Sequence, residues 1–272
     1  MTYKIIFTDI DGTLLNKDRQ LSPLTLKVFQ QLREKIPVVL ISSRMPQAMK
    51  HLQEELNIVH HPLICYNGAL INIDGKTVGS KEIPWEIIKD LHDFNFELDC
   101  HISLYNNTDW CVPKMDQWAK REENNTKVTP QIKSTNAVLE DWKNSEKGAH
   151  KIMCMGEADK INALEDHLFG RFKNQLHLSR SKDTYLEITN KDVSKLTAVK
   201  YLLDKHFHLS LEETIAFGDN YNDFEMLKAA GMGIAVGNAR PEVLEIAKQV
   251  THYNTEDGVA KSLQQLFNLS QF

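Results

Sequence analysis

Two aspartates, Asp9 and Asp11, directly follow a short apolar run near the start of the chain, and Gly12 and Thr13 come next. The β-branched and aromatic residues 5–7 predict a buried strand, so the two carboxylates stand at its carboxyl end. Carboxylates this close repel each other unless a metal ion or a proton intervenes. The pattern therefore predicts a divalent cation at the end of this strand.

Other polar residues follow predicted strands in the same manner elsewhere in the chain. They are Ser42 after residues 38–41, Asp219, Asn222 and Asp223 after residues 214–217, and Lys195 at the start of the helix that precedes the latter strand. Open parallel sheets bind ligands at the carboxyl ends of their strands. We therefore expect these residues to gather beside the aspartate pair.

This set of oxygen and nitrogen groups suits the transfer of a phosphoryl group. Mg²⁺ takes oxygen ligands, usually one or two carboxylates with waters and substrate phosphate, and Asp9 and Asp219 are candidates for the carboxylates. A carboxylate can attack phosphorus to form an aspartyl phosphate, while the metal and Lys195 screen the repulsion between anions. Ser42 and the backbone N–H groups near Gly12 suit the other phosphate oxygens. A second carboxylic acid two residues on is placed to protonate the leaving group and then to deprotonate water.

Strand-like and helix-like segments alternate in the first and last thirds of the chain, which predicts a parallel sheet covered on both faces. The expected strands are residues 3–8, 38–41, 63–66, 69–73, 214–217 and 233–236, and expected helices begin near Pro23, Pro46, Ser194 and Pro241. The fold class is therefore α/β, with a doubly wound, Rossmann-like parallel sheet as its core.

The pattern changes after about residue 83, where the strands become shorter and more polar. All four tryptophans lie between residues 85 and 142, and core packing of a small domain is the default interpretation for most of them. One alternating domain that is interrupted by an α+β insertion explains this order best. The expected core is discontinuous, residues 1–82 and 185–272, and the inserted domain is residues 83–184.

The ordered motifs resemble those of the haloacid dehalogenase (HAD) superfamily of phosphohydrolases. The motifs are Asp9-Ile-Asp-Gly-Thr13, Ser42, Lys195 and Gly218-Asp-Asn-Tyr-Asn-Asp223. The position and size of the insertion resemble the cap of the Cof-type (subclass IIB) sugar phosphatases, and residues 65–69, 235–239 and 256–259 are also similar to that branch. The resemblance covers nearly the whole chain, although the middle third matches in layout more than in residues.

The resemblance implies a role for each motif residue. It makes Asp9 the nucleophile and Asp11 the general acid and base. The implied magnesium ligands are Asp9, Asp11 through its backbone carbonyl, and Asp219, with Asp223 either supporting the metal site or orienting Lys195. Ser42 and Lys195 are implied to bind the phosphoryl group, and Asn222 to contact the phosphate.

One segment departs from the family pattern. Where the family often has Thr-Gly-Arg after the second strand, this chain has Ser42, Ser43 and Arg44. Serine keeps the hydroxyl of the first position, but serine at the second raises the question of a positive φ, which it tolerates poorly. Arg44 either reaches the substrate or lies on the surface. Gly12, Ser43 and Arg44 complete the predicted phosphate pocket.

Composition limits the class of partner and the compartment. The 272 residues are 42% hydrophobic and 25% charged, as in ordinary globular proteins. A net charge of −5 argues against a nucleic-acid surface. No apolar run approaches the length needed to span a membrane, and no secretory apolar region follows the first residues. The four cysteines show no CxxC spacing, which favours buried free thiols in a cytoplasmic protein.

The sequence thus predicts a magnesium-dependent phosphomonoester hydrolase that acts on a small soluble phosphate, with a sugar phosphate as the expected class. Polar candidates for substrate choice in the inserted domain are His101, Tyr105, Arg180 and Lys182. Three alternatives stay open: a phosphomutase, a phosphate-accepting signalling module of the receiver type, and a non-catalytic binding protein on the same scaffold. Receivers are much shorter and have no inserted domain, and a phosphomutase would pass its phosphate to sugar in preference to water.

Overall fold

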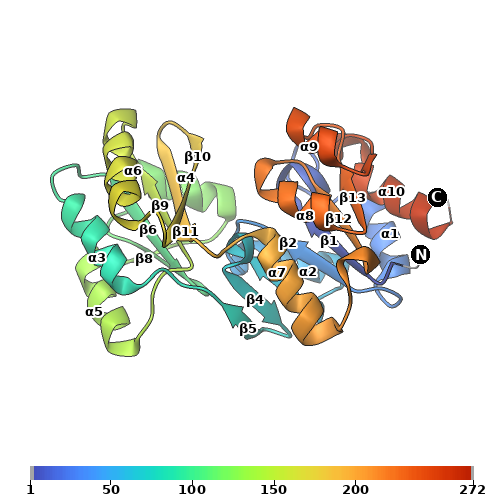
Figure 1. The fold of residues 1–272 in the computed structure, drawn as a ribbon, viewed down its shortest axis with the longest axis horizontal. Coiled ribbons are helices and arrows are strands. Elements are labelled where there is room, and N and C mark those ends of the chain that lie inside the picture. The colour runs from blue at the N-terminus through green and yellow to red at the C-terminus, as the bar shows by residue number, and fades with distance from the viewer. Residues whose placement is uncertain (1–2, 271–272) are drawn as a thin grey trace. The chain divides into compact units, whose positions relative to one another are not determined.

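The apolar runs of the first and last thirds form one eight-stranded sheet in the computed structural model, which describes residues 3–270 (Figure 1). The strand order is β14-β13-β12-β1-β2-β3-β4-β5. The bounds are β1 (Ile5–Asp9), β2 (Val38–Ile41), β3 (Leu63–Cys65), β4 (Leu70–Ile73), β5 (Lys76–Ser80), β12 (Thr214–Gly218), β13 (Met232–Ala235) and β14 (Gln249–Val250). From β14 to β3 neighbouring strands are parallel, and β4 runs antiparallel to β3.

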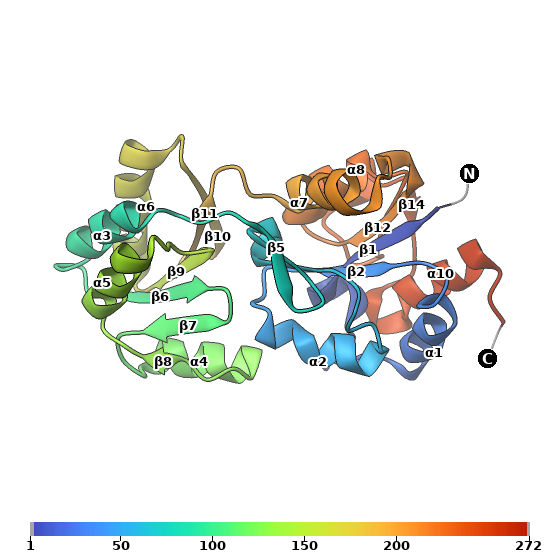
Figure 2. The ribbon, with the colours of Figure 1, turned by 90° about the horizontal axis from the view of Figure 1, so that it is seen from below.

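Helices cover both faces of this sheet. They are α1 (Pro23–Leu32), α2 (Gln47–Leu56), α7 (Lys195–Leu202), α8 (Phe224–Ala229), α9 (Pro241–Ile246) and α10 (Gly258–Phe267). Figure 2 shows α7 and α8 on one face and α1 and α10 on the other. As the sequence predicts, α1 begins at Pro23, and Ser22 caps it by accepting the N–H of Thr25. The doubly wound α/β class is confirmed.

The middle of the chain forms a second sheet of six strands with its own core. The order is β10-β11-β9-β6-β7-β8. Strand bounds are β6 (His101–Asn106), β7 (Asp109–Val112), β8 (Gln131–Ile132), β9 (Lys151–Met155), β10 (Leu176–Lys182) and β11 (Tyr185–Asn190), and the helices are α3 (Trp85–Phe94), α4 (Gln117–Thr126), α5 (Thr135–Ser145) and α6 (Ala158–Phe172). Ile88 of α3 and Leu164 of α6 join Ile102 and Cys154 of the sheet in one buried cluster.

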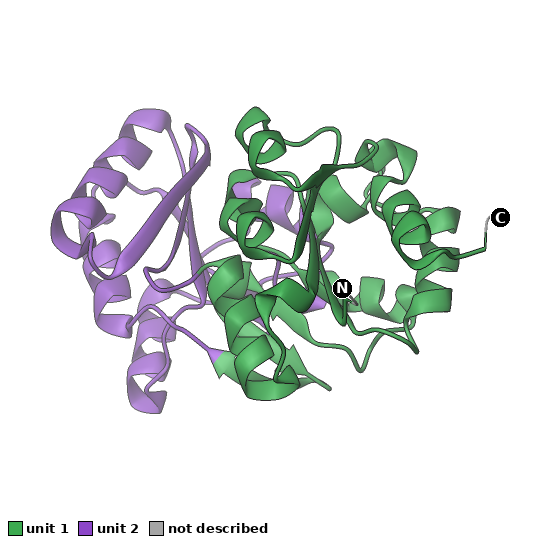
Figure 3. Cartoon of the chain, turned by 45° about the vertical axis from the view of Figure 1, so that its right-hand side comes forward, with its two compact units in different colours: residues 1–43, 49–79, 194–272 green, residues 44–48, 80–193 purple. Residues whose placement is uncertain are grey.

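The boundaries of the inserted unit differ from those expected from the sequence. The chain divides into one compact unit of Met1–Ser43, Met49–Gly79 and Ser194–Phe272 and a second of Arg44–Ala48 and Ser80–Val193 (Figure 3). The expected boundary at residues 184 and 185 separates β10 from β11, yet these strands pair with each other, and β11 also pairs with β9. The residues of a short strand do not reveal which sheet it joins, so the boundary at 184 was wrong by one strand.

Two structural features concern the predictions made from composition: the state of the cysteines and the length and polarity of the helices. All four cysteines are free and buried, and burial raises the pKa of the Cys65 and Cys154 thiols well above the usual value. Among residues 3–270, each helix is too short or too polar to cross a bilayer.

Candidate active site

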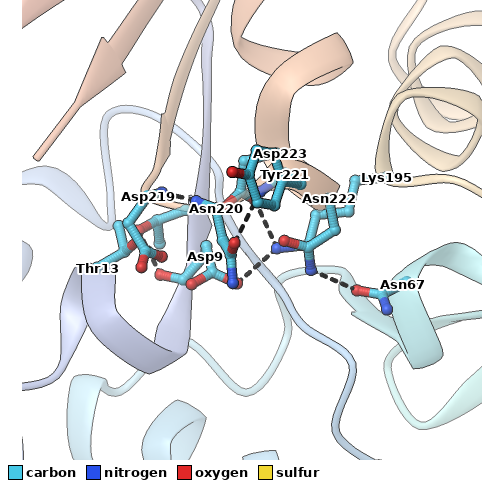
Figure 4. A network of polar contacts seen from close by, with 10 residues as sticks. Asp9, Thr13, Asn67, Lys195, Asp219, Asn220, Tyr221, Asn222 and Asp223 are labelled. Carbon is cyan, nitrogen blue, oxygen red and sulfur yellow. Dashed lines mark hydrogen bonds and ion pairs between the residues drawn. The ribbon is translucent and has the colours of Figure 1, made fainter. Parts of the chain in front are cut away.

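The carboxyl ends of β1 and β12 bring two acidic residues together. The two strands pair in parallel with Thr8 opposite Phe217, so Asp9 at the end of β1 and Asp219 just beyond β12 lie at the same edge of the sheet. One carboxylate oxygen from each, and one from Asp223, lie within 4.8 Å of one another. Figure 4 shows these side chains converging from the two strand ends. The predicted gathering of acids at the strand ends is therefore present.

Lys195 supplies the positive charge of this cluster. It occupies the first position of α7, which Ser194 and Thr197 cap through reciprocal hydrogen bonds. Its side chain is completely buried, and Nζ donates to Asp9 Oδ1 at 2.5 Å and to Asp223 Oδ1 at 2.6 Å (Figure 4). A buried ammonium needs such partners, because removal of a charge from water is costly unless it is paired.

Asp223 uses both of its oxygens within the protein. Oδ1 accepts from Lys195, and Oδ2 accepts the backbone N–H groups of Asp219 at 3.0 Å and of Asn220 at 3.1 Å. Gly218 makes room for this arrangement, since a Cβ there would lie 2.5 Å from the Asp223 side chain. These contacts join Asp223 to Lys195 and to the backbone of the loop after β12, while one of its carboxylate oxygens also lies within 4.8 Å of those of Asp9 and Asp219.

Asp9 and Asp219 each present one oxygen that lacks a hydrogen-bond donor within residues 3–270. Asp219 Oδ1 accepts from the Thr13 hydroxyl at 2.9 Å and Asp9 Oδ1 from Lys195, which leaves both Oδ2 atoms. Gly12 stands at φ +84°, and a Cβ there would lie 2.5 Å from Asp219 Oδ2. Glycine thus supplies the positive φ and keeps the space beside this oxygen clear.

The charges in the cluster do not balance, because three carboxylates face one ammonium. Burial raises the pKa of Asp9 well above its usual value, and burial together with Asp223 raises the pKa of Asp219 to about 6. Burial alone would lower the pKa of Lys195, but the carboxylates of Asp223 and Asp9 raise it above its usual value, so the amine stays protonated. A set of oxygen donors with excess negative charge fits Mg²⁺, which Asp9 and Asp219 would hold.

Two other predicted residues lie near these strand ends in different environments. Asp11 is outside the carboxylate cluster; its side chain is 38% exposed and pairs with Arg19 at 3.5 Å. Ser42 is buried at the end of β2, where its N–H donates to the carbonyl of Ile64 and its carbonyl accepts from the N–H of Asn67. These backbone bonds fix Ser42 at the same sheet edge as Asp9, which pairs in register with Ile41.

The remaining predicted phosphate residues come from two loops, one after β2 and one after β12. Asn222 donates from Nδ2 to Asn67 Oδ1 at 3.0 Å, which joins the loop after β12 to the loop after β3 (Figure 4). Ser43 does not have a positive φ, so serine at this position carries no left-handed strain. Arg44 donates to the carbonyl of Ala48 at 3.1 Å and belongs to the segment that groups with the second unit.

Sequence reasoning missed three side chains of this network. Thr13 was quoted as part of the first motif without a role, yet its hydroxyl binds Asp219. Asn67 lies in residues 65–69, for which the resemblance implied no individual roles; it adopts φ +56°, and its side chain accepts from Asn222. Arg19 gave no signal, because a lone arginine in a polar loop is ordinary.

The whole chain resembles proteins that are already classified. Residues 6–263 match the family of haloacid dehalogenase-like hydrolases. A protein of Haemophilus influenzae named as a putative phosphatase is 34% identical over 98% of this chain and 99% of its own length. The 5-amino-6-(5-phospho-D-ribitylamino)uracil phosphatase YitU of Bacillus subtilis is 27% identical over 97% of this chain and 98% of its own.

Solved structures give the same result for the fold. A haloacid dehalogenase-like hydrolase from Bacteroides thetaiotaomicron superposes with a TM-score of 0.90 at 29% identity and covers 98% of this chain and 100% of its own. A HAD subclass IIB sugar phosphatase shares the fold with a TM-score of 0.79 at 22% identity, over 98% of this chain and 100% of its own. As its motifs predict, the chain belongs to the haloacid dehalogenase-like hydrolase family.

Proposed function

We propose that this chain is a magnesium-dependent phosphomonoester hydrolase that acts on a small soluble sugar phosphate through an aspartyl-phosphate intermediate. One observation carries the proposal: Asp9 has one oxygen 2.5 Å from the buried ammonium of Lys195 and a second that accepts no hydrogen bond within residues 3–270. A carboxylate held in this way is oriented by one oxygen and available as a nucleophile through the other.

The substrate class rests on the named relatives. The Haemophilus influenzae relative is named a putative phosphatase, and the Bacillus subtilis relative YitU is named for a phosphate ester of a ribityl chain. Both align over nearly the whole of this chain. A phosphorylated sugar or sugar alcohol is therefore the first class to test, and the inserted unit, residues 80–193, is proposed to act as the cap that selects it.

In the first half of the reaction, Asp9 Oδ2 attacks phosphorus and the bond from phosphorus to the ester oxygen breaks. The leaving alkoxide takes a proton from Asp11, while Lys195 offsets negative charge on the transferring group. Ser42, Ser43, Arg44, Asn222 and the N–H of Gly12 are the proposed phosphate contacts. Mg²⁺, held by Asp9, Asp219 and the backbone carbonyl of Asp11, would supply the remaining charge neutralisation.

In the second half, water attacks the phosphorus of the aspartyl phosphate. Asp11, now deprotonated, accepts the proton from that water, and the bond from phosphorus to Asp9 breaks. The products are inorganic phosphate and the regenerated Asp9 carboxylate, so one water is consumed for each ester cleaved. The four free thiols favour a reducing, cytoplasmic site of action.

Phosphate release tests the proposal directly. The pure protein is given p-nitrophenyl phosphate and a panel of sugar phosphates, with Mg²⁺ or with EDTA, and products are analysed for free phosphate against transferred phosphate. We expect turnover with Mg²⁺ only, and its loss in Asp9→Asn. Asp204→Asn, at an exposed ion pair with Lys205, is the matched control. Absence of turnover by the wild type, or full turnover by Asp9→Asn, would refute the proposal.

The acid role of Asp11 has its own test. General acid catalysis is worth about 10²–10⁴-fold, and an alkoxide leaving group needs the proton more than nitrophenolate does. Asp11→Asn should therefore slow hydrolysis of a sugar phosphate more than hydrolysis of p-nitrophenyl phosphate. Equal losses on the two substrates would remove Asp11 from this role.

A further inference from the structure

Two asparagines from distant loops hold the backbone of the loop that follows β1. Asn238, after β13, donates from Nδ2 to the carbonyl of Gly12 at 2.7 Å. Asn254, after β14, donates from Nδ2 to the carbonyl of Leu15 at 2.8 Å. The two are joined, because the N–H of Asn254 donates to Asn238 Oδ1 at 2.9 Å. We call this pair the asparagine brace.

These contacts fix the orientation of the Asn238 side-chain amide. Its nitrogen faces a carbonyl and its oxygen faces an N–H, so a rotated amide would lose both hydrogen bonds. The Gly12–Thr13 peptide is trans, so fixing the Gly12 carbonyl also fixes the direction of the Thr13 N–H. Glycine at φ +84° has many other conformations open to it, and the brace selects one of them.

The brace belongs to a closed ring of contacts around the two acid-bearing loops. Asn238 binds Gly12, and two residues later the N–H of Arg240 donates to the carbonyl of Asp219 at 2.9 Å. Asp219 in turn accepts from the Thr13 hydroxyl at 2.9 Å. The short segment 238–240 therefore sets the position of the β1 loop and the β12 loop relative to each other.

The loop that carries Asn254 is itself tightly held. Thr251 Oγ1 donates to the carbonyl of Gly258 at 2.8 Å, and the N–H of Gly258 donates to the carbonyl of Tyr253 at 3.1 Å. A Cβ at Gly258 would lie 2.1 Å from the carbonyl oxygen of His252, so only glycine allows this closure. Residues 235–239 and 256–259, which had no role from the sequence, thus form and support the brace.

From this geometry, we propose that Asn238 is a positioning residue for the hydrolytic reaction, which rests on the function proposed above. Asn238 acts through the backbone: it holds the Gly12 carbonyl and thereby the loop that joins Asp9, Asp11 and Thr13. It is not a catalytic residue, since its amide is occupied by Gly12 and Asn254. Misplacement of reacting groups by about 1 Å can cost about 10²-fold in rate.

The surface position of Asn238 makes it possible to distinguish a positioning role from a purely structural one. Asn238 lies on the surface, and surface substitutions rarely change stability much. If the contact to the Gly12 carbonyl had no effect on the position of the reacting groups, Asn238→Ala would resemble the wild type in both stability and turnover. A positioning role predicts an intact fold with a lower kcat.

The experiment compares Asn238→Ala and Asn238→Asp with the wild type. Aspartate keeps the shape and the acceptor for the Asn254 N–H, but it cannot donate to the Gly12 carbonyl. We expect kcat for p-nitrophenyl phosphate with Mg²⁺ to fall about 10–100-fold in both variants, with KM within about threefold and the thermal midpoint close to that of the wild type. Asn72→Ala, which loses a side-chain contact to Thr77 in the β4–β5 hairpin, is the matched control.

Hydrogen exchange gives a readout that does not depend on turnover. Amides of residues 12–15 should exchange faster in both Asn238 variants and at the wild-type rate in Asn72→Ala. Wild-type kcat in Asn238→Ala, wild-type kcat in Asn238→Asp, or unchanged exchange at residues 12–15 would each overturn the proposal. If the wild type releases no phosphate, the proposed function fails and the exchange measurement alone decides whether the brace orders the loop.

Discussion

Each compact unit buries a row of linked polar side chains, one at the ends of β1 and β12 and one across β6 and β7. The first row is Asp219, Asp9, Lys195 and Asp223, in which three carboxylates share one ammonium. The second row, which we call the histidine network, is Asp116, His101, Ser103 and Trp110. Asp116 Oδ2 lies 2.8 Å from His101 Nδ1, His101 Nε2 lies 2.8 Å from Ser103 Oγ, and Trp110 Nε1 donates to Ser103 Oγ at 3.1 Å.

Every donor in the histidine network has an acceptor when His101 is neutral. With a proton on Nδ1, His101 donates to Asp116, and Nε2 accepts from the Ser103 hydroxyl, which in turn accepts from Trp110. The other oxygen of Asp116 accepts the N–H groups of Trp118 and Ala119 in the first turn of α4. Burial also lowers the pKa of His101, in agreement with the neutral form.

The two clusters differ in charge balance and in how many of their polar atoms have hydrogen-bond partners, and this difference identifies the reactive one. Aspartate, histidine and serine in this order are the residues of a hydrolytic triad, yet Ser103 has no exposed surface and its oxygen already accepts from Trp110. The histidine network is complete, because each of its donors already has an acceptor within it. The Asp9 cluster is incomplete, because it has excess negative charge and two oxygens that accept no hydrogen bond within residues 3–270.

The largest effect should follow removal of the one ammonium in the incomplete cluster. Loss of one partner from a buried ion pair typically costs about 3–5 kcal/mol, so Lys195→Met should lower the free energy of unfolding by about that amount. Turnover should fall by about 10²–10³-fold, the usual loss for a removed electrostatic stabiliser. Urea unfolding and phosphate release measure the two. Lys205→Met, at an exposed pair with Asp204, should change neither the free energy of unfolding nor turnover. Equal losses in Lys195→Met and Lys205→Met would show that the buried ammonium has no special role.

A divalent cation should stabilise only the unit with the incomplete cluster. A ligand that binds the folded state at 100 times its Kd adds about 2.7 kcal/mol, so Mg²⁺ should raise the thermal midpoint of the wild type. Asp219→Asn removes one carboxylate and should lose most of this increase. His101→Gln alters the complete network and should keep it. A Mg²⁺ response that is unchanged in Asp219→Asn would place the cation elsewhere.

The sequence predicts the residues of the incomplete cluster better than it predicts their contacts. Asp9, Asp219 and Lys195 could be found because each stands at the end of an apolar strand or at the start of a capped helix, which are local patterns. Which oxygen of Asp223 meets Lys195 depends on how the loop after β12 closes over Gly218. The sequence contains no periodic pattern from which loop geometry of this kind could be predicted.

Contacts between distant segments escaped prediction for a related reason. The Asn238 contact to Gly12 joins positions 226 residues apart, and a lone asparagine after a strand indicates only a turn. The strand β11 was assigned to the wrong unit because a six-residue strand carries no signal for its pairing partners, which are β10 and β9. His101 was one of several polar candidates for substrate choice, and its partners Asp116 and Ser103 were not foreseen.

An intermediate loss of stability is expected when Ser103, at the centre of the histidine network, loses its hydroxyl. Ser103→Ala leaves the Trp110 N–H and His101 Nε2 buried without their partner, and such an unsatisfied group costs about 1–3 kcal/mol. Denaturant unfolding should show this loss, while kcat on p-nitrophenyl phosphate stays within about twofold of the wild type because the network holds no reacting group. A large loss of kcat in a folded Ser103→Ala variant would show that the network is more than structural.

The smallest effect is a dependence of stability on pH that the complete network should cause. Burial holds the pKa of His101 below its usual 6.5 in the folded state, so below about pH 6.5 the unfolded chain binds a proton that the folded chain does not. The contribution of His101 to stability is therefore full above pH 6.5 and decreases as pH falls, by at most about 1.4 kcal/mol per pH unit. His101→Gln should be less stable at pH 7 but should have a shallower slope between pH 6.5 and 5. His61 and His150 shift in the same direction and keep part of the slope, so identical slopes in the two proteins would mean that His101 is not held neutral.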